Sequence, residues 1–119
     1  MKRLIIVALG AWICGASIAE AHAFLDHAEP RVGSAVASSP STVKIWFTDG
    51  LLASSKIEVF DSSGKAVDKK DVKIDPADKS SMAVSVSQLS AGEYKVVWNA
   101  YCPLGHHTSG SFTFEVKSP

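Results

Sequence analysis

The sequence predicts an all-β fold from residue 22 onwards, a Greek-key β-sandwich or barrel of about seven strands. Two observations support this prediction. Apolar and polar residues alternate in short runs, as they do in strands with one buried face. Clusters of glycine, serine, aspartate and proline separate these runs. No helical period follows the first 21 residues, so helices are not expected to contribute to the core.

The first three strands recognised by alternation are short. Residues 43–48 (VKIWFT) have a large apolar residue at every second position, which predicts one buried face. Residues 57–60 (IEVF) continue this pattern and end at residues 61–65 (DSSGK), a turn-forming cluster. Residues 72–74 (VKI) form a brief strand before an Asp-Pro pair.

The second half of the chain contains the longest predicted strand. Residues 82–87 (MAVSVS) alternate strictly, and a Ser-Ala-Gly turn then leads into residues 93–101 (EYKVVWNAY), the longest strand candidate. Residues 112–116 (FTFEV) supply the last inward-facing set. By contrast, residues 30–40 contain one glycine, three serines and two prolines, so we expect irregular structure there.

Residues 1–21 are typical of a secretory signal peptide. A Lys-Arg pair (2–3) precedes an apolar core (4–18), and residues 19–21 (AEA) match the A-x-A cleavage pattern. The alternative is a membrane anchor, but the apolar core is short for a span of about 20 residues. We therefore expect cleavage after Ala21, which leaves residues 22–119 as a single secreted domain.

Composition argues against nucleic acid as a partner. The whole chain has 12 basic and 12 acidic side chains, and residues 22–119 retain 10 and 11 of them, a formal net charge of −1. A protein that binds phosphate backbones needs a basic face. Cleavage also removes Cys14, so Cys102 remains alone and cannot form an intramolecular disulfide, although the expected compartment is oxidising.

Four histidines fall in two clusters near the ends of the mature sequence. His22 and His27 lie at its start and His106 and His107 near its end, with no histidine among the 78 residues 28–105. In a sandwich the first strand and the last hairpin can be neighbours, so the clusters can converge. Adjacent strand residues point to opposite faces, so one of His106 and His107 should face the site and the other the solvent.

His22 becomes the first residue after cleavage, and its free α-amine is then available. The usual pKa of an α-amine is about 7.7–8.0, so it loses its proton far more readily than a lysine does. The amine and the Nδ1 atom of one histidine can chelate a metal, and a further imidazole completes three nitrogen ligands. Such a set suits tetragonal Cu(II). The alternative is an ordinary histidine at a chain terminus.

Four segments together resemble the CopC family of periplasmic copper-binding proteins. They are HAFLDHAEPRVGSAV (22–36), VKIWFTDGL (43–51), LSAGEYKVVW (89–98) and GHHTSGSFTFEV (105–116). The resemblance covers nearly all of the mature sequence, and the ordered set is more specific than any one segment.

The resemblance implies a cupredoxin-like Greek-key barrel or sandwich of seven strands. It also implies a Cu(II) site in which His22 binds through its amine and imidazole, and His106 through its imidazole, with Asp49 at the position of an acidic residue near the copper. The implied role is copper homeostasis or resistance without enzymatic activity. In that role the protein buffers copper in the periplasm or passes it to a CopD-like inner-membrane protein.

The sequence departs from the family pattern in its final loop. Leu104 stands where the family usually has an aspartate that contributes to the Cu(II) site, and His107 stands where it usually has proline. Asp49, His27 or Cys102 could take the place of the missing carboxylate. The candidate metal ligands are therefore His22, His106, Asp49, Cys102 and His107.

Sulfur ligation by Cys102 is an alternative to a site of nitrogen and oxygen ligands. Cys102 lies in a Cys-x-x-x-His spacing with His106, and a thiolate would favour Cu(I) over Cu(II). A free cysteine can equally be a small buried hydrophobe. Met82 is the only methionine in the mature sequence, so a methionine-rich Cu(I) site is not expected.

Three other functions use the same features differently. A copper enzyme similar to lytic polysaccharide monooxygenases also uses an N-terminal histidine, but the sequence has no aromatic stripe for sugar stacking, since Trp46 and Trp98 lie in strand patterns. An electron-transfer cupredoxin needs two histidines, a cysteine and an axial ligand, usually a methionine, and none follows His106. A sandwich without metal leaves the histidine clusters unexplained.

Overall fold

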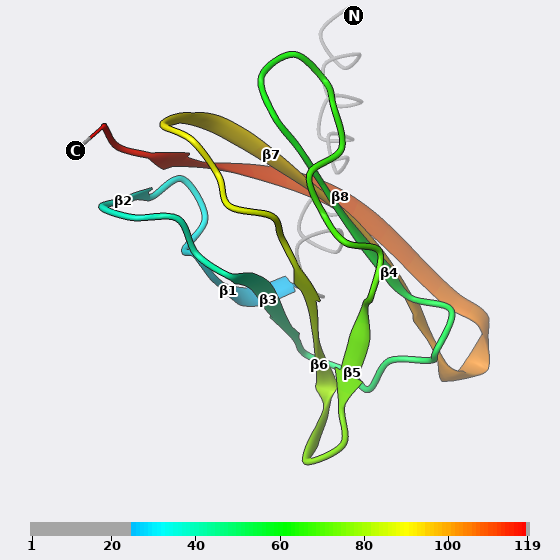
Figure 1. Cartoon of the computed structure of the whole chain (residues 1–119). Coiled ribbons are helices and arrows are strands. Elements are labelled where there is room, and N and C mark those ends of the chain that lie inside the picture. The colour runs from blue at the N-terminus through cyan, green and yellow to red at the C-terminus, as the bar shows by residue number, and fades with distance from the viewer. Residues whose placement is uncertain (1–24, 119) are drawn as a thin grey trace, which may run out of the picture.

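Two four-stranded β-sheets pack against each other in the computed structural model, which describes residues 25–118 (Figure 1). One sheet has the strand order β1-β3-β6-β5 and the other β2-β8-β7-β4. The strands are β1 (Leu25–Glu29), β2 (Ala35–Val36), β3 (Thr42–Phe47), β4 (Lys56–Phe60), β5 (Lys73–Asp75), β6 (Asp78–Ser85), β7 (Gly92–Cys102) and β8 (His106–Val116). The predicted all-β sandwich is confirmed. Within the described range, no helix has the length and apolar character needed to cross a membrane.

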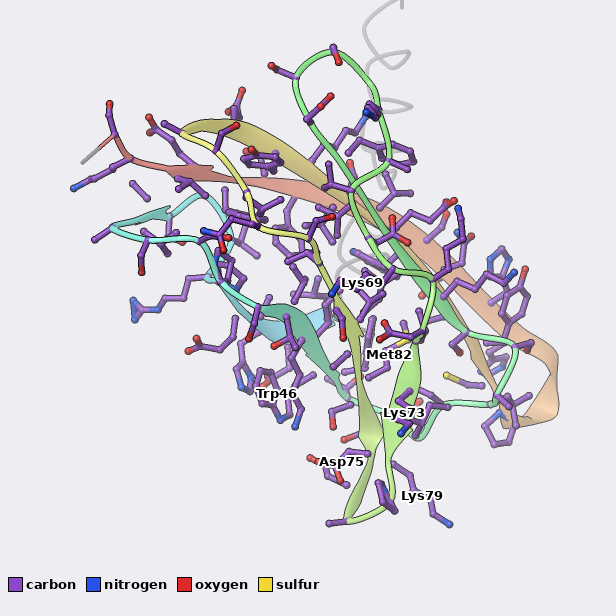
Figure 2. The ribbon with its side chains drawn as sticks, in the orientation of Figure 1. Trp46, Lys69, Lys73, Asp75, Lys79 and Met82 are labelled. Carbon is purple, nitrogen blue, oxygen red and sulfur yellow. The ribbon has the colours of Figure 1, made fainter. Side chains whose placement is uncertain are left out.

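The core lies between the two sheets and follows the alternation in the sequence. Val43, Ile45 and Phe47 of β3 are at most 4% exposed, whereas the intervening Trp46 is only half-buried. Figure 2 shows Trp46 pointing away from the core and Met82 of β6 lying between the sheets. Met82 is fully buried, so its thioether is closed off from solvent.

Residues 30–40 differ from the prediction of irregular structure. They contain the two-residue strand β2, which pairs in parallel with the end of β8 through Ala35–Glu115 and Val36–Val116. Two residues are too few to give an alternation signal, and their pairing partner lies about 80 positions away, at a separation that local patterns do not report. Counting β2, the described residues form eight strands instead of about seven.

The β7–β8 hairpin is the longest pairing in the fold. Each strand has 11 residues, and the register runs from Gly92–Val116 to Cys102–His106. A 3₁₀ turn, Pro103–Gly105, joins the strands, and Gly105 has a φ of +77°, in the left-handed region that favours glycine. His106 and His107 are therefore the first residues of β8, in the segment that the family pattern treats as its final loop.

Candidate metal centre

The register of the hairpin decides the environment of His106. Cys102 pairs with His106, and directly opposed residues project from the same face of a sheet. Cys102 is 3% exposed and belongs to the core cluster, so this face is the inner one. His106 is exposed at the end of the inner face, and the described residues provide no partner for its ring.

His107 lies on the outer face of the same hairpin. It pairs with Tyr101, and the two rings stack with centroids 4.3 Å apart and an interplanar angle of 5°. Its Nε2 atom is 3.2 Å from the Oδ1 atom of Asn99, and because that oxygen only accepts, the ring nitrogen donates. The two histidines therefore project from opposite faces of the hairpin, as predicted. His106 faces inward, and His107 is held on the outside.

Asp49 approaches the same end of the sandwich from the segment between β3 and β4. Two contacts fix this segment to the end of β7. The N–H of Leu52 donates to the carbonyl of Tyr101 (2.8 Å), and the buried Ser55 hydroxyl accepts from the Tyr101 N–H (2.9 Å). The charge of exposed Asp49 acts on the Cys102 thiol, which places the carboxylate near the inner face of the hairpin.

Cys102 is poorly suited to bind a metal in its resting state. Burial raises the pKa of its thiol, and the negative charge of Asp49 raises this pKa further. A thiol must lose its proton before it binds a metal. Burial and the raised pKa therefore favour a small buried hydrophobe over a thiolate ligand.

The described chain begins close to this end of the fold. Leu25 is paired with Phe47, two residues before Asp49. Leu25 also lines a groove of about 310 Å³ together with Trp98 and Gly110 of the hairpin. His22, the candidate N-terminal ligand, precedes Leu25 by three residues and lies outside the described residues.

His27 lies on the other side of the first sheet. The register shifts between Leu25 and His27, and the His27 ring then stacks on Trp46 at 4.3 Å with an interplanar angle of 9°. Its Nδ1 atom is 2.6 Å from the Oδ2 atom of Asp26. His27 therefore occupies the outer face and does not join Cys102 and His106 on the inner face.

Residues 25–118 do not complete a metal site with their own side chains. In this range no three His, Cys, Asp or Glu side chains come together in a group that could hold a metal ion. His106 and Asp49, two of the predicted ligands, lie at one end of the sandwich. A larger depression, of about 430 Å³ beside Phe60 and Tyr94, contains none of the predicted ligands.

Sequence reasoning missed three polar groups near this end. The Ser55 hydroxyl fixes the segment between β3 and β4, and Thr108 Oγ1 and Trp98 Nε1 are buried without a partner. For Thr108 a signal was present, because extending the alternation of Phe112, Phe114 and Val116 backwards places Thr108 on the inner face. For Ser55 the sequence offers none, since its partner is 46 residues away.

A protein-family model and solved structures of similar proteins indicate the same family for this chain. The CopC domain model matches residues 25–117. The crystal structure of CopC from Methylosinus trichosporium OB3b is 31% identical, with a TM-score of 0.75, over 82% of this chain and 95% of that one. PcoC, a methionine-rich copper resistance protein from Escherichia coli, is 30% identical, with a TM-score of 0.68, over 79% and 97%. Protein YobA of Escherichia coli K12 is 27% identical over 99 residues, 82% of this chain and 80% of that protein.

Proposed function

The chain belongs to the CopC family, and from this premise we propose that it is a non-enzymatic copper protein that binds Cu(II) through His22 and His106. The observation that carries the proposal is the environment of His106. This imidazole is exposed, has no partner among the described residues, and lies at the end of the sandwich where Asp49 and the first described residue, Leu25, are also found.

The N-terminal histidine is the ligand that best completes the site. Three residues of extended chain span at most about 10–11 Å, so His22 remains within that distance of Leu25. Its α-amine and imidazole would supply two nitrogen atoms and His106 a third, a set suited to tetragonal Cu(II). The lack of a complete ligand group within residues 25–118 supports a requirement for this terminal residue.

The remaining candidate ligands differ in how well they suit the fourth coordination position of the Cu(II) ion. Asp49 is exposed and bears a carboxylate, so we place it first. Cys102 is buried and its thiol pKa is raised, and His107 already pairs with Asn99 and Tyr101. Residue 104 is leucine and has no ligand atom, so we expect weaker Cu(II) binding than an additional carboxylate would give.

We place this activity in the periplasm, after removal of residues 1–21. There the protein would buffer copper or carry it to a CopD-like protein of the inner membrane, and so contribute to copper homeostasis or resistance. The likeness to PcoC, a copper resistance protein, supports this role. Met82, the only methionine in residues 22–119, is fully buried, so we expect no thioether site for Cu(I).

The experiment that tests the proposal compares two mature proteins. One begins at His22 and the other carries a single extra glycine before it. Both are titrated with Cu(II) against a competing chelator, and electron paramagnetic resonance spectra are recorded. We expect the added glycine to weaken binding strongly and to change the nitrogen hyperfine pattern, because it removes the α-amine from the chelate ring.

Two results would contradict the proposal in different ways. Equal affinity and equal spectra would mean that the amine of His22 is not a ligand. Failure of both proteins to bind Cu(II) would mean that this family member has lost the metal site.

A further inference from the structure

Two buried side-chain atoms within residues 25–118 have no hydrogen-bond partner, and both belong to the β7–β8 hairpin that carries His106. They are Thr108 Oγ1 and Trp98 Nε1. Thr108 pairs with Ala100, and Trp98 pairs with Gly110. Ala100 is 1% and Trp98 5% exposed, so both unpaired atoms belong to the inner face of the hairpin, in the same row as His106.

The Thr108 hydroxyl makes no hydrogen bond within residues 25–118. A buried polar atom without a partner destabilises the folded state, and valine would fill the same space without that penalty. Buried polar groups that lack a hydrogen-bond partner are often found at functional sites. The unpaired oxygen therefore suggests that Thr108 Oγ1 gains a hydrogen-bond donor when the protein binds its ligand.

His106 is the neighbour that can provide such a partner. It lies two residues before Thr108, and residues two apart in a strand share a face. When one ring nitrogen of a histidine binds a metal, the N–H of the other nitrogen almost always donates to a nearby acceptor. Thr108 Oγ1 can accept this hydrogen bond, whereas Trp98 Nε1 only donates, and Trp98 lies two register pairs further along the hairpin.

We propose that Thr108 is the positioning residue of the copper site: its Oγ1 accepts the N–H of the His106 ring nitrogen that does not bind copper. This inference rests on the proposed function. The hydrogen bond fixes the tautomer and the orientation of the imidazole and raises its basicity as a ligand. The His107 ring already has a hydrogen-bond partner, because its Nε2 atom donates to Asn99 on the outer face.

The test uses Thr108→Val, which removes the hydroxyl and keeps the shape of the side chain. We expect Cu(II) affinity to fall about 10- to 100-fold, the usual effect of losing such a partner. Pulsed electron paramagnetic resonance detects the remote imidazole nitrogen of bound histidine, and its quadrupole coupling should change. Thr108→Ser should restore both properties. Ser109→Ala, on the outer face opposite Asn99, is the matched control and should behave as wild type.

Stability separates positioning from a merely structural role. In the metal-free protein the hydroxyl is unpaired, so Thr108→Val should unfold in urea at the same concentration as wild type or at a higher one. A lower midpoint together with an unchanged remote-nitrogen signal would overturn the inference.

A His106→Ala protein distinguishes the two ways in which the test can fail. If it binds Cu(II) as tightly as wild type, the proposed copper site itself is wrong. If His106→Ala weakens binding but Thr108→Val changes neither the affinity nor the remote-nitrogen signal, the copper site stands and the role of Thr108 is refuted.

Discussion

His106 and His107 show how far the chemistry of one residue type depends on its face of a strand. The His106 ring lies at the inner face and has no partner within residues 25–118, whereas the His107 ring stacks on Tyr101 and donates to Asn99. We therefore expect His106→Ala to lower Cu(II) affinity by at least about 100-fold, since loss of a supporting residue alone typically costs about 10- to 100-fold. His107→Ala should instead lower the free energy of unfolding by about 0.5–1.5 kcal/mol, the usual value of a ring pair.

Competition titrations with Cu(II) and urea denaturation of the metal-free proteins check this contrast. Each variant is the control for the other, because the two substitutions lie at adjacent positions but on opposite faces of the β7–β8 hairpin. Loss of copper affinity in His107→Ala with none in His106→Ala would reverse the assignment of the two faces.

At the scale of the elements, the β7–β8 hairpin depends on a close contact between a glycine and an indole. A Cβ atom added to Gly110 would lie 2.6 Å from Cζ2 of Trp98, whose ring is buried in the core. We therefore expect Gly110→Ala to lower the free energy of unfolding by about 1–3 kcal/mol, as overpacking a core does. Urea denaturation measures the change.

Gly50→Ala is the matched control for this contact. Nothing lies within 4 Å of a Cβ atom added at Gly50, so its stability should stay within about 0.5 kcal/mol of wild type. Equal losses in the two variants would show that the effect comes from glycine flexibility and not from the indole.

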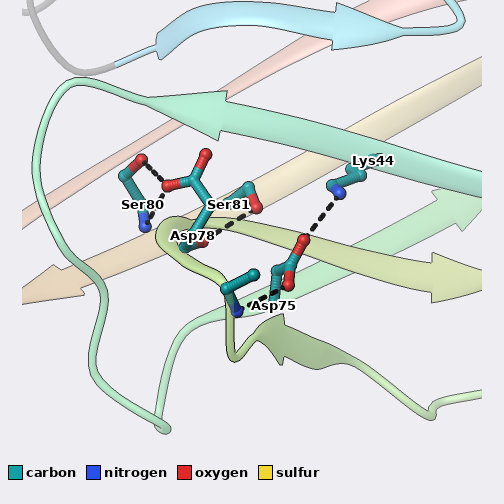
Figure 3. Close-up of polar contacts among 6 residues, drawn as sticks. Lys44, Asp75, Asp78, Ser80 and Ser81 are labelled. Atoms are coloured by element: carbon teal, nitrogen blue, oxygen red, sulfur yellow. Dashed lines mark hydrogen bonds and ion pairs between the residues drawn. The ribbon is translucent and has the colours of Figure 1, made fainter.

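At the scale of the whole molecule, four aspartates in the loops and strand ends make stability depend on pH. The backbone N–H groups of Lys65, Ser85 and Ala77 lower the pKa values of Asp61, Asp71 and Asp75, respectively. The Ser80 hydroxyl lowers the pKa of Asp78. Figure 3 shows the side chains of Asp75 and Asp78 and the ion pair between Asp75 and Lys44. The Lys44 Nζ atom is 3.1 Å from the Oδ2 atom of Asp75.

The direction of these shifts predicts loss of stability in acid. A carboxylate whose pKa is lower in the folded state stabilises the fold above its unfolded pKa, about 3.9 for aspartate, and this contribution disappears as the pH falls through the folded pKa. We expect the urea midpoint to begin to fall near pH 4 and to continue falling below it. A protein with asparagine at residues 61, 71, 75 and 78 should show a weaker dependence, and an unchanged dependence would assign the effect to other groups.

The sequence by itself determined the sandwich, most of its strands and the inner face of each, because alternation is a local property that depends only on the pleat. It also separated His106 from His107 onto opposite faces. The tertiary structure decided which of the two faces the core, since that depends on the pairing of Cys102 with His106 across the hairpin. Similarly, β2, the Ser55 contact and the burial of the Thr108 hydroxyl depend on neighbours distant in the chain, which no local pattern reports. His22 remains a prediction of the sequence.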